Sequence, residues 1–137
     1  MMDSIEVIEG QIVAEFDRLE TVDEKYAYLF RLGEQLAPMA AALKTEQNQV
    51  KGCQSTLWFY LDRRDGRYYL LADSDSMVMK GIAALLARVI AGQPAEAICT
   101  LELDFLDALG IWRLPSERNN GLVAMLDHLK RQVSERD

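Results

Sequence analysis

The 137-residue sequence is poor in the residues that metal sites and disulfide frameworks need. It has two cysteines, Cys53 and Cys99, and a single histidine, His128. A structural zinc or iron–sulfur site takes about four ligands, usually with closely spaced cysteine pairs. Here the cysteines lie 46 positions apart (99 − 53 = 46). The sequence therefore predicts no resident metal, and in a reducing compartment both cysteines are expected to be free thiols.

Several other signals are missing as well. Lysine and arginine number 15 against 22 acidic residues, giving a net charge of −7, so no nucleic-acid partner is expected. The longest apolar stretch, residues 77–92, contains Lys80 and Arg88 and falls short of the roughly 20 residues of a membrane span. No secretory signal opens the chain, and neither G-x-G-x-x-G nor a Walker lysine occurs. We expect a soluble, cytoplasmic protein that holds no cofactor and contacts no membrane.

What the sequence does have is a periodic hydrophobic pattern. Half of its residues are hydrophobic, which is enough for one domain over residues 1–137. Apolar residues recur at helical spacing over residues 5–19 and again from about 23 to 37, where Pro38 marks the end of the second predicted helix. The polar segment 44–51 is expected to be irregular, with room for a short edge strand.

The period then changes from that of a helix to that of a strand. Residues 55–61 alternate strongly apolar positions with Trp58 and Tyr60, and "YYLLA" at 68–72 returns as a second strand. Between them, Asp65-Gly66 is a tight-turn signal, so a β-hairpin is predicted. The "DSDS" of residues 73–76 offers N-cap oxygens for a helix over 77–91, which is apolar almost all round and is expected to be central.

The C-terminal part is predicted to be helical. A short helical piece is expected near residues 103–109, and "NNG" at 119–121 is expected to open a last helix with one apolar stripe. Helices, then an antiparallel sheet of about three strands, then further helices define an α+β domain.

Cys53 is the residue whose setting is least ordinary. It follows Gly52 and precedes Gln54-Ser55, just before the predicted strand. Glycine permits a positive φ, which suits a turn that presents the thiol, and Lys51 nearby favours the reactive thiolate. A small residue packed in the core fits the same position, so a functional and a structural interpretation of this cysteine both remain open.

The other chemical candidates favour structural roles. Cys99 lies among apolar residues at a helix end and is expected to be a small core residue. His128 lies beside the apolar stripe of the last helix and is expected to be half-exposed. A Cys–His hydrolase would need it to meet Cys53 with a third, orienting group, which nothing in the sequence predicts. The Asp73–Ser76 cluster fits a helix cap better than a metal site or a catalytic acid.

Three motifs in one order resemble those of the SufE family of sulfur acceptors. They are "VKGCQSTLWFYL", "ADSDSMVMKGIAALL" and "LPSERNNGLVAML", and "VDEKYAYLFRLGEQL" is similar to the family's second helix. The third motif departs from the usual Thr/Ser-Pro-Ser-Arg, although Arg118 still aligns. The likeness spans nearly the whole chain and implies the fold that this family shares with iron–sulfur scaffold proteins, helices packed on a short antiparallel sheet.

The resemblance also implies a function. Cys53 would take sulfur as a persulfide from a cysteine desulfurase, whose pyridoxal phosphate belongs to the partner, stimulate that enzyme, and pass the sulfur on for iron–sulfur cluster assembly. Gly52, Gln54, Asp75, Lys80 and Arg118 would form the surrounding loop and walls. The partners would be the desulfurase and a downstream scaffold or other sulfur recipient, with the chain a monomer or a weak homodimer. Such a protein is a sulfur-transfer partner rather than a free-standing enzyme.

Two alternatives to this interpretation stay open. The chain fits the paralogous branch of the same family, which serves another desulfurase and a different sulfur pathway. It also fits a noncatalytic adaptor in which Cys53 is structural.

Overall fold

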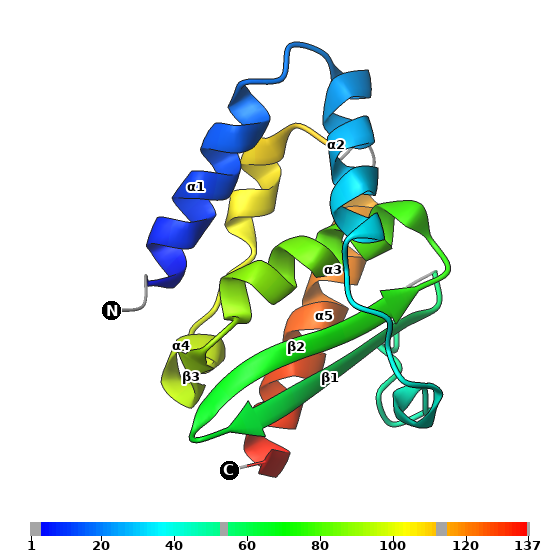
Figure 1. Ribbon diagram of the computed structural model, residues 1–137, viewed down its shortest axis with the longest axis vertical. Coiled ribbons are helices and arrows are strands. Elements are labelled where there is room, and N and C mark those ends of the chain that lie inside the picture. Colours follow the sequence, from blue (N-terminus) through cyan, green and yellow to red (C-terminus); the bar gives the residue numbers. More distant parts are fainter. Residues whose placement is uncertain (1–3, 53–54, 112–114, 137) are drawn as a thin grey trace.

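Helices pack against one face of a three-stranded antiparallel sheet of order β1-β2-β3 in the computed structural model (Figure 1). The structure describes residues 4–52, 55–111 and 115–136, and for 115–120 the backbone alone. The α+β class is therefore as expected. In chain order the elements are α1 (Ile5–Asp17), α2 (Val22–Glu34), the 3₁₀ turn η1 (Ala41–Leu43), β1 (Leu57–Arg64), β2 (Arg67–Ser74), α3 (Met77–Ile90), β3 (Gln93–Pro94), α4 (Ala95–Cys99), the 3₁₀ segment η2 (Asp104–Leu109) and α5 (Pro115–Arg136).

Side-chain caps fix the starts of the three helices that precede β3. Ser4 accepts a hydrogen bond from the backbone N–H of the third residue of α1, and Thr21 does the same for α2. Ser76 caps α3, accepting from Met79 N at 3.3 Å. A Ser or Thr hydroxyl satisfies backbone donors that a helix start otherwise leaves unpaired. The expected role of the Asp73–Ser76 cluster as a helix cap is thereby confirmed.

The predicted hairpin forms around Asp65-Gly66. Both residues have positive φ, 53° and 77°, as a two-residue type I′ turn requires. The strands pair from Leu57 with Ser74 to Arg64 with Arg67. Alternate residues of the hairpin point to one face and are buried there: Leu57, Phe59, Leu61, Tyr68, Leu70 and Ala72.

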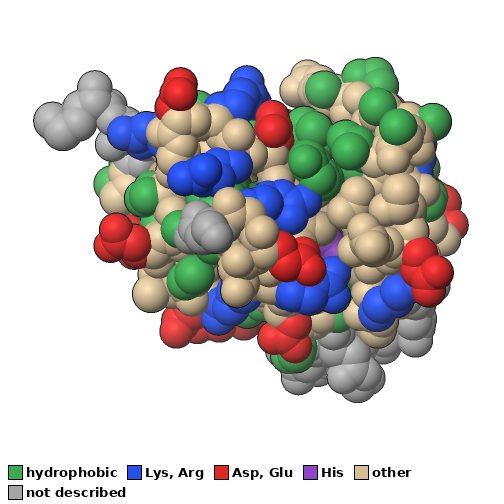
Figure 2. All heavy atoms as spheres, turned by 90° about the horizontal axis from the view of Figure 1, so that it is seen from below, with side chains coloured by type: hydrophobic (Ala, Val, Ile, Leu, Met, Phe, Trp, Pro, Cys, Tyr) green, Lys and Arg blue, Asp and Glu red, His purple; other side chains and the backbone are tan. Residues whose placement is uncertain are grey.

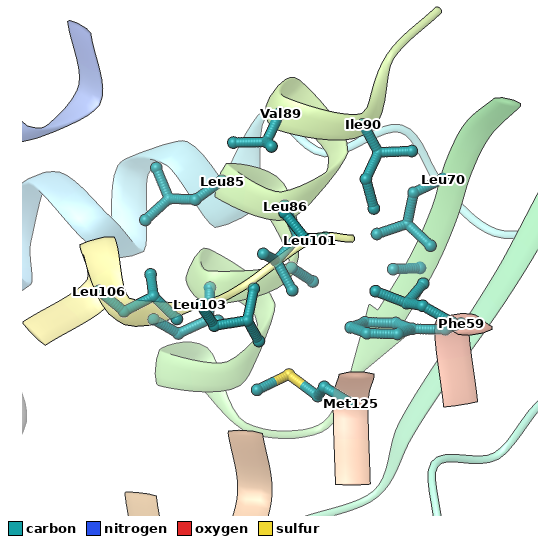
Figure 3. Close-up of a cluster of buried hydrophobic side chains, with 14 of the residues drawn as sticks. Phe59, Leu70, Leu85, Leu86, Val89, Ile90, Leu101, Leu103, Leu106 and Met125 are labelled. Carbon is teal, nitrogen blue, oxygen red and sulfur yellow. The ribbon is translucent and has the colours of Figure 1, made fainter. Parts of the chain in front are cut away.

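The core lies between this face of the sheet and the helices. Helix α3 runs alongside the hairpin, and α5 crosses behind it (Figure 1). The nearly all-round burial of α3 confirms the predicted central helix. Figure 3 shows side chains of α3 meeting Phe59 and Leu70 from the sheet and Met125 from α5. Helices α2 and α3 approach closely at two glycines, since a Cβ on Gly33 would lie 3.0 Å from the backbone nitrogen of Gly81.

The last helix begins earlier than predicted. It starts at Pro115 rather than at the "NNG" of 119–121, because proline is well suited to the first helical position. Strand β3 has no counterpart in the prediction, whereas α4 ends at Cys99, where a helix end was expected. Helix α2 ends at Glu34, before the expected position near 37. No helix within the described part of the chain is long and apolar enough to cross a membrane.

His128 is buried, contrary to the expectation of a half-exposed surface residue. Its exposure is 3%, and its Nε2 lies 3.0 Å from the carbonyl oxygen of Phe59 on β1. Gln132, one turn further along α5, accepts a hydrogen bond from Leu61 N at 2.8 Å and donates to the same Phe59 carbonyl. These are outward-pointing backbone groups at the edge of the sheet, where polar partners are required. The polar side chains of α5 therefore complete the free edge of β1.

Side-chain donors approach both ring nitrogens of His128. Arg131 Nη2 lies 3.2 Å from Nδ1, and the amide nitrogen of Gln132 lies 2.8 Å from Nε2, which is itself 3.0 Å from the carbonyl oxygen of Phe59. Burial lowers the pKa of His128 below 6.5, with the charge of Arg131 acting in the same direction and the hydrogen bond to Phe59 opposing it. The neutral imidazole is thus the form that fits this position.

Candidate functional site

The segment that carries Cys53 joins the irregular region after η1 to strand β1. Cys53 and Gln54 lie outside the described residues, so the structure locates the residues on either side of them. Gly52 has φ +86°, the left-handed conformation that favours glycine. A Cβ built on Gly52 would lie 3.5 Å from the Cβ of Ala124. The chain therefore approaches position 53 along the surface of α5.

The other end of the segment is held by the turn between β2 and α3. The backbone N–H of Thr56 donates to Asp75 Oδ1 at 3.1 Å, and Asp75 N donates back to the Thr56 carbonyl at 3.3 Å. The Ser74 hydroxyl donates to the same carbonyl at 2.6 Å. A hydrogen bond of 2.8 Å from Val50 N to Leu57 O closes the loop. The chain thus passes Ala124 of α5 just before position 53, and just after it Thr56 is hydrogen-bonded to the turn that precedes α3.

Of the predicted wall residues, Gly52 and Asp75 therefore flank the loop directly. Lys80 lies one turn into α3, and its Nζ is 3.6 Å from Asp73 Oδ1. The Nζ of Lys44 lies 2.7 Å from the other oxygen of Asp73. The side chain of Arg118 is outside the described residues, although its backbone belongs to the first turns of α5.

The carboxylate of Asp73 is held ionised by its neighbours. Burial alone would raise the pKa of Asp73, but the hydrogen bonds from Lys44 and from the Ser74 N–H, with the charges of Lys44 and Lys80, outweigh it and lower the pKa. A carboxylate so paired is a poor proton donor or acceptor near neutral pH. The group of Lys44, Asp73 and Lys80 therefore ties the chain after η1, β2 and α3 together.

A polar groove of about 800 Å³ lies beside the loop, between residues 45–51 and the C-terminal half of α5. Lys51 lies 3.6 Å from Glu46, and Arg131 donates to the carbonyl of Gln47, so these cations already have protein partners. Figure 2 shows Lys and Arg side chains interspersed with Asp and Glu on the end of the molecule seen there.

Cys99 is exposed, so the expectation of a core cysteine is wrong. It is the last residue of α4, in which Ile98 is the buried position. Successive helical residues point about 100° apart, so burial of Ile98 turns its neighbour outward. Among the residues that the structure describes, no three His, Cys, Asp or Glu side chains are grouped so that they could hold a metal ion.

Two of the loop's contacts could not be found from sequence reasoning. Thr56 is engaged through its backbone, which carries no sequence signature, and Ala124 is an ordinary small residue on a helix. Asp75 was expected near the loop through the family resemblance, and its hydrogen bond to Thr56 gives the physical reason for that position.

The fold and this loop belong to a known class of protein. The family model of SufE, described as an Fe–S metabolism associated domain, matches residues 10–133. The chain belongs to the SufE family. Membership supports a sulfur-transfer role in iron–sulfur metabolism.

Individual relatives agree with this assignment. The chain is 36% identical over 127 residues to SufE-like protein 1, chloroplastic/mitochondrial, of Arabidopsis thaliana. The aligned region covers 90% of this chain but only 34% of the relative. An uncharacterised SufE-like protein of Rhizobium meliloti is 30% identical over 132 residues, covering 92% of this chain and 94% of the relative. The solution structure of a hypothetical protein from Thermus thermophilus matches with a TM-score of 0.75 at 22% identity, covering 93% and 94% of the two chains, and shares the fold.

Proposed function

We propose that this protein accepts sulfur on Cys53 from the persulfide of a pyridoxal-phosphate-dependent cysteine desulfurase and carries it to a recipient in iron–sulfur cluster assembly. The observation that supports this most is the hydrogen bond from Thr56 N to Asp75, with the left-handed Gly52 close to Ala124 of α5. These residues hold the chain on both sides of position 53, as a carrier thiol that must meet a donor sulfur requires.

The transfer is thiol exchange on sulfur. The Cys53 thiol loses its proton, and the thiolate attacks the outer sulfur of the donor's persulfide. The donor's S–S bond breaks, its electron pair leaves on the inner sulfur, and that thiolate takes up a proton. One S–S bond is lost and one is formed on Cys53, so no external oxidant or reductant is needed. Delivery to the recipient repeats the same exchange with Cys53 as the leaving thiolate.

A lysine close in sequence to Cys53 is the feature that favours the nucleophilic form of the thiol. Lys51, two residues before Cys53, has a side chain that is 58% exposed, and its ammonium is 3.6 Å from Glu46. A nearby cation favours the thiolate over the thiol. In this proposal the chain supplies the acceptor, while the desulfurase supplies the cofactor, the cysteine-binding site and the activated sulfur.

The test is to locate the transferred sulfur. The wild-type protein is incubated with a cysteine desulfurase and ³⁵S-labelled cysteine, and the labelled peptide is identified by mass. Cys53→Ser should take up no sulfur and should no longer stimulate turnover of the desulfurase. Cys99→Ser is the matched control, because it removes the other thiol, which is exposed, and it should behave as the wild type. Stimulation of the desulfurase by Cys53→Ser at the wild-type level, or label on Cys99 before Cys53, would overturn the proposal.

The choice between iron–sulfur assembly and another sulfur pathway depends on the partner. The same assay with purified desulfurases of different branches measures which of them transfers sulfur fastest to Cys53. Fastest transfer from a desulfurase outside cluster assembly would favour the paralogous branch of the family.

A further inference from the structure

A short antiparallel pairing closes the base of the loop that precedes β1. Gln49 and Trp58 form an isolated antiparallel β-bridge, and Figure 1 shows the chain after η1 beside the start of β1. Residues 48–50 and 57–59 are therefore the two arms of a stem, and residues 51–56 form the loop that connects them. Both arms of the stem belong to the described part of the chain.

Backbone hydrogen bonds join the two arms. Val50 N donates to the carbonyl of Leu57, and Phe59 N donates to the carbonyl of Asn48, both at 2.8 Å. Each arm is shorter than the usual strand of about five or six residues. The register of the stem therefore depends strongly on side chains that contact both arms.

Gln132 of α5 is hydrogen-bonded to both arms of the stem. Its side chain is buried, with an exposure of 1%. Its amide nitrogen lies 3.2 Å from Asn48 Oδ1 on one arm and 2.8 Å from the carbonyl oxygen of Phe59 on the other. Its amide oxygen accepts a hydrogen bond from Leu61 N at 2.8 Å. A side-chain amide has two N–H donors and one acceptor oxygen, so a single buried group fixes the first arm against the second.

Asn48 extends this connection to the chain before the stem. Its side chain is also buried, with an exposure of 9%, and its Nδ2 donates to the carbonyl of Leu43 at 2.8 Å. Arg131, the neighbour of Gln132, donates to the carbonyl of Gln47 at 3.1 Å. Helix α5 therefore holds two successive residues where the chain enters the stem.

We propose that Gln132, acting through Asn48, is a positioning residue for the acceptor thiol of Cys53. This inference rests on the proposed function. The loop of residues 51–56 is short, so a shift of one arm of the stem relative to the other moves the loop as well. Sulfur exchange requires the thiolate to meet the donor sulfur, and a displacement of about 1 Å at a reacting atom can slow a reaction about a hundredfold. Gln132 therefore acts on the rate of transfer through the geometry of the stem.

Native-state amide hydrogen exchange measures whether Gln132 holds the stem. Gln132→Met keeps a flexible side chain of similar length and removes the amide. The amides of Val50 and Phe59 should then exchange at least about tenfold faster than in the wild type, as local opening of the stem requires. The amide of Gly92, which donates to the carbonyl of Tyr68 on another strand, should exchange at the wild-type rate.

The kinetics of sulfur transfer test the positioning itself. The rate of persulfide formation on Cys53 is measured against the concentration of loaded desulfurase. Gln132→Met and Asn48→Ala should each lower the rate at saturating donor by about tenfold and leave the half-saturating concentration unchanged. The double variant should be no slower than the slower single variant, because both substitutions break the same link. Asn48→Ala lies outside α5 and carries the test if Gln132→Met folds poorly.

Arg136→Met is the matched control. Arg136 lies one turn beyond Gln132 on α5 and donates to the carbonyl of Leu61, which is outside the stem. Its replacement removes a hydrogen bond to the same strand from the same helix, and it should leave sulfur transfer at the wild-type rate.

The outcomes separate the positioning role from the acceptor function. Unchanged exchange of the Val50 and Phe59 amides, wild-type transfer rates in both single variants, or an equal loss in Arg136→Met would overturn the positioning role. Multiplicative losses in the double variant, or a loss seen only as a higher half-saturating concentration, would overturn it as well. Absence of persulfide on wild-type Cys53 would instead overturn the acceptor function, and amide exchange would still show whether Gln132 holds the stem.

Discussion

Replacing Gly52 by alanine should impair sulfur uptake far more than it impairs stability. The φ of Gly52 is +86°, a conformation that costs a residue with a Cβ roughly 1–2 kcal/mol. Steric overlap adds nothing, because the new Cβ would lie 3.5 Å from Ala124 Cβ, an ordinary contact distance. The expected loss of unfolding free energy is therefore about 1–2 kcal/mol, too small to unfold a domain of this size.

Gly66 provides the matched control. Its φ is +77°, and a Cβ there would meet nothing within 4 Å, so Gly66→Ala should lose about the same 1–2 kcal/mol through the same backbone strain. It lies in the hairpin turn, at the opposite end of β1 from the Cys53 loop. Gly66→Ala should therefore lower stability and leave sulfur transfer at the wild-type rate.

The two variants are compared by urea unfolding and by the rate of persulfide formation on Cys53 with excess loaded desulfurase. An alanine that relaxes to negative φ would redirect the chain as it enters position 53. A displacement of about 1 Å at a reacting atom can slow a reaction by about a hundredfold, so a decrease of at least about tenfold is expected for Gly52→Ala. Equal transfer rates in the two variants would show that the left-handed Gly52 does not position the acceptor.

Two further predictions concern the scaffold. Gly81→Ala should destabilise the protein by about 1–3 kcal/mol through overpacking, because the new Cβ would lie 2.6 Å from the carbonyl oxygen of Leu29. Gly10→Ala should instead stabilise α1 by about 0.5–1 kcal/mol, because the new Cβ would have nothing within 4 Å. Denaturant unfolding measures both, and a gain in stability for Gly81→Ala would contradict the close helix crossing. The second prediction concerns pH: burial lowers the pKa of His128 from 6.5, so its contribution to stability is complete above pH 6.5 and is lost as pH falls toward the folded value. Burial and three neighbouring carboxylates raise the pKa of Glu9 from 4.5 to about 7, so stability from this group increases as pH falls through that interval. When the free energy of unfolding is measured against pH, His128→Gln should reduce the loss of stability on the acid side, and Glu9→Gln should enlarge that loss. A pH dependence unchanged from the wild type would contradict these assignments.

Features that depend on neighbouring residues in the chain were predictable. Asp65-Gly66 specifies its turn through the positive φ that both residues adopt, and the hydroxyl of Ser76 specifies the start of α3 through a bond three residues away. The alternation of residues 57–61 fixed which face of β1 is buried. In each case the signal and the structure that it specifies lie within a few residues.

Features that depend on distant contacts were not predictable. His128 is buried because it contacts the carbonyl of Phe59, 69 positions earlier, at the edge of β1. The periodicity of the helix that carries His128 holds no information about that distant strand edge. The exposure of Cys99 follows from which residue of the short helix α4 turns inward. At the candidate site, the sequence pattern and the family resemblance predicted Gly52 and Asp75, while the backbone of Thr56 could not be predicted because hydrogen bonds to backbone leave the residue type free.

Helix α5 lies close both to the segment that carries Cys53 and to the edge of β1. Ala124 lies against Gly52, and one turn later His128 begins the row of polar side chains that completes the edge of β1. The first anchor, at Gly52, therefore lies beside the same helix that completes the edge of β1, and the second anchor, at Asp75, belongs to the turn that leads into α3. Neither anchor uses the side chain of Cys53, so replacing its sulfur by oxygen should leave both in place. Loss of transfer in Cys53→Ser would then report on the chemistry at sulfur rather than on the architecture that holds the loop.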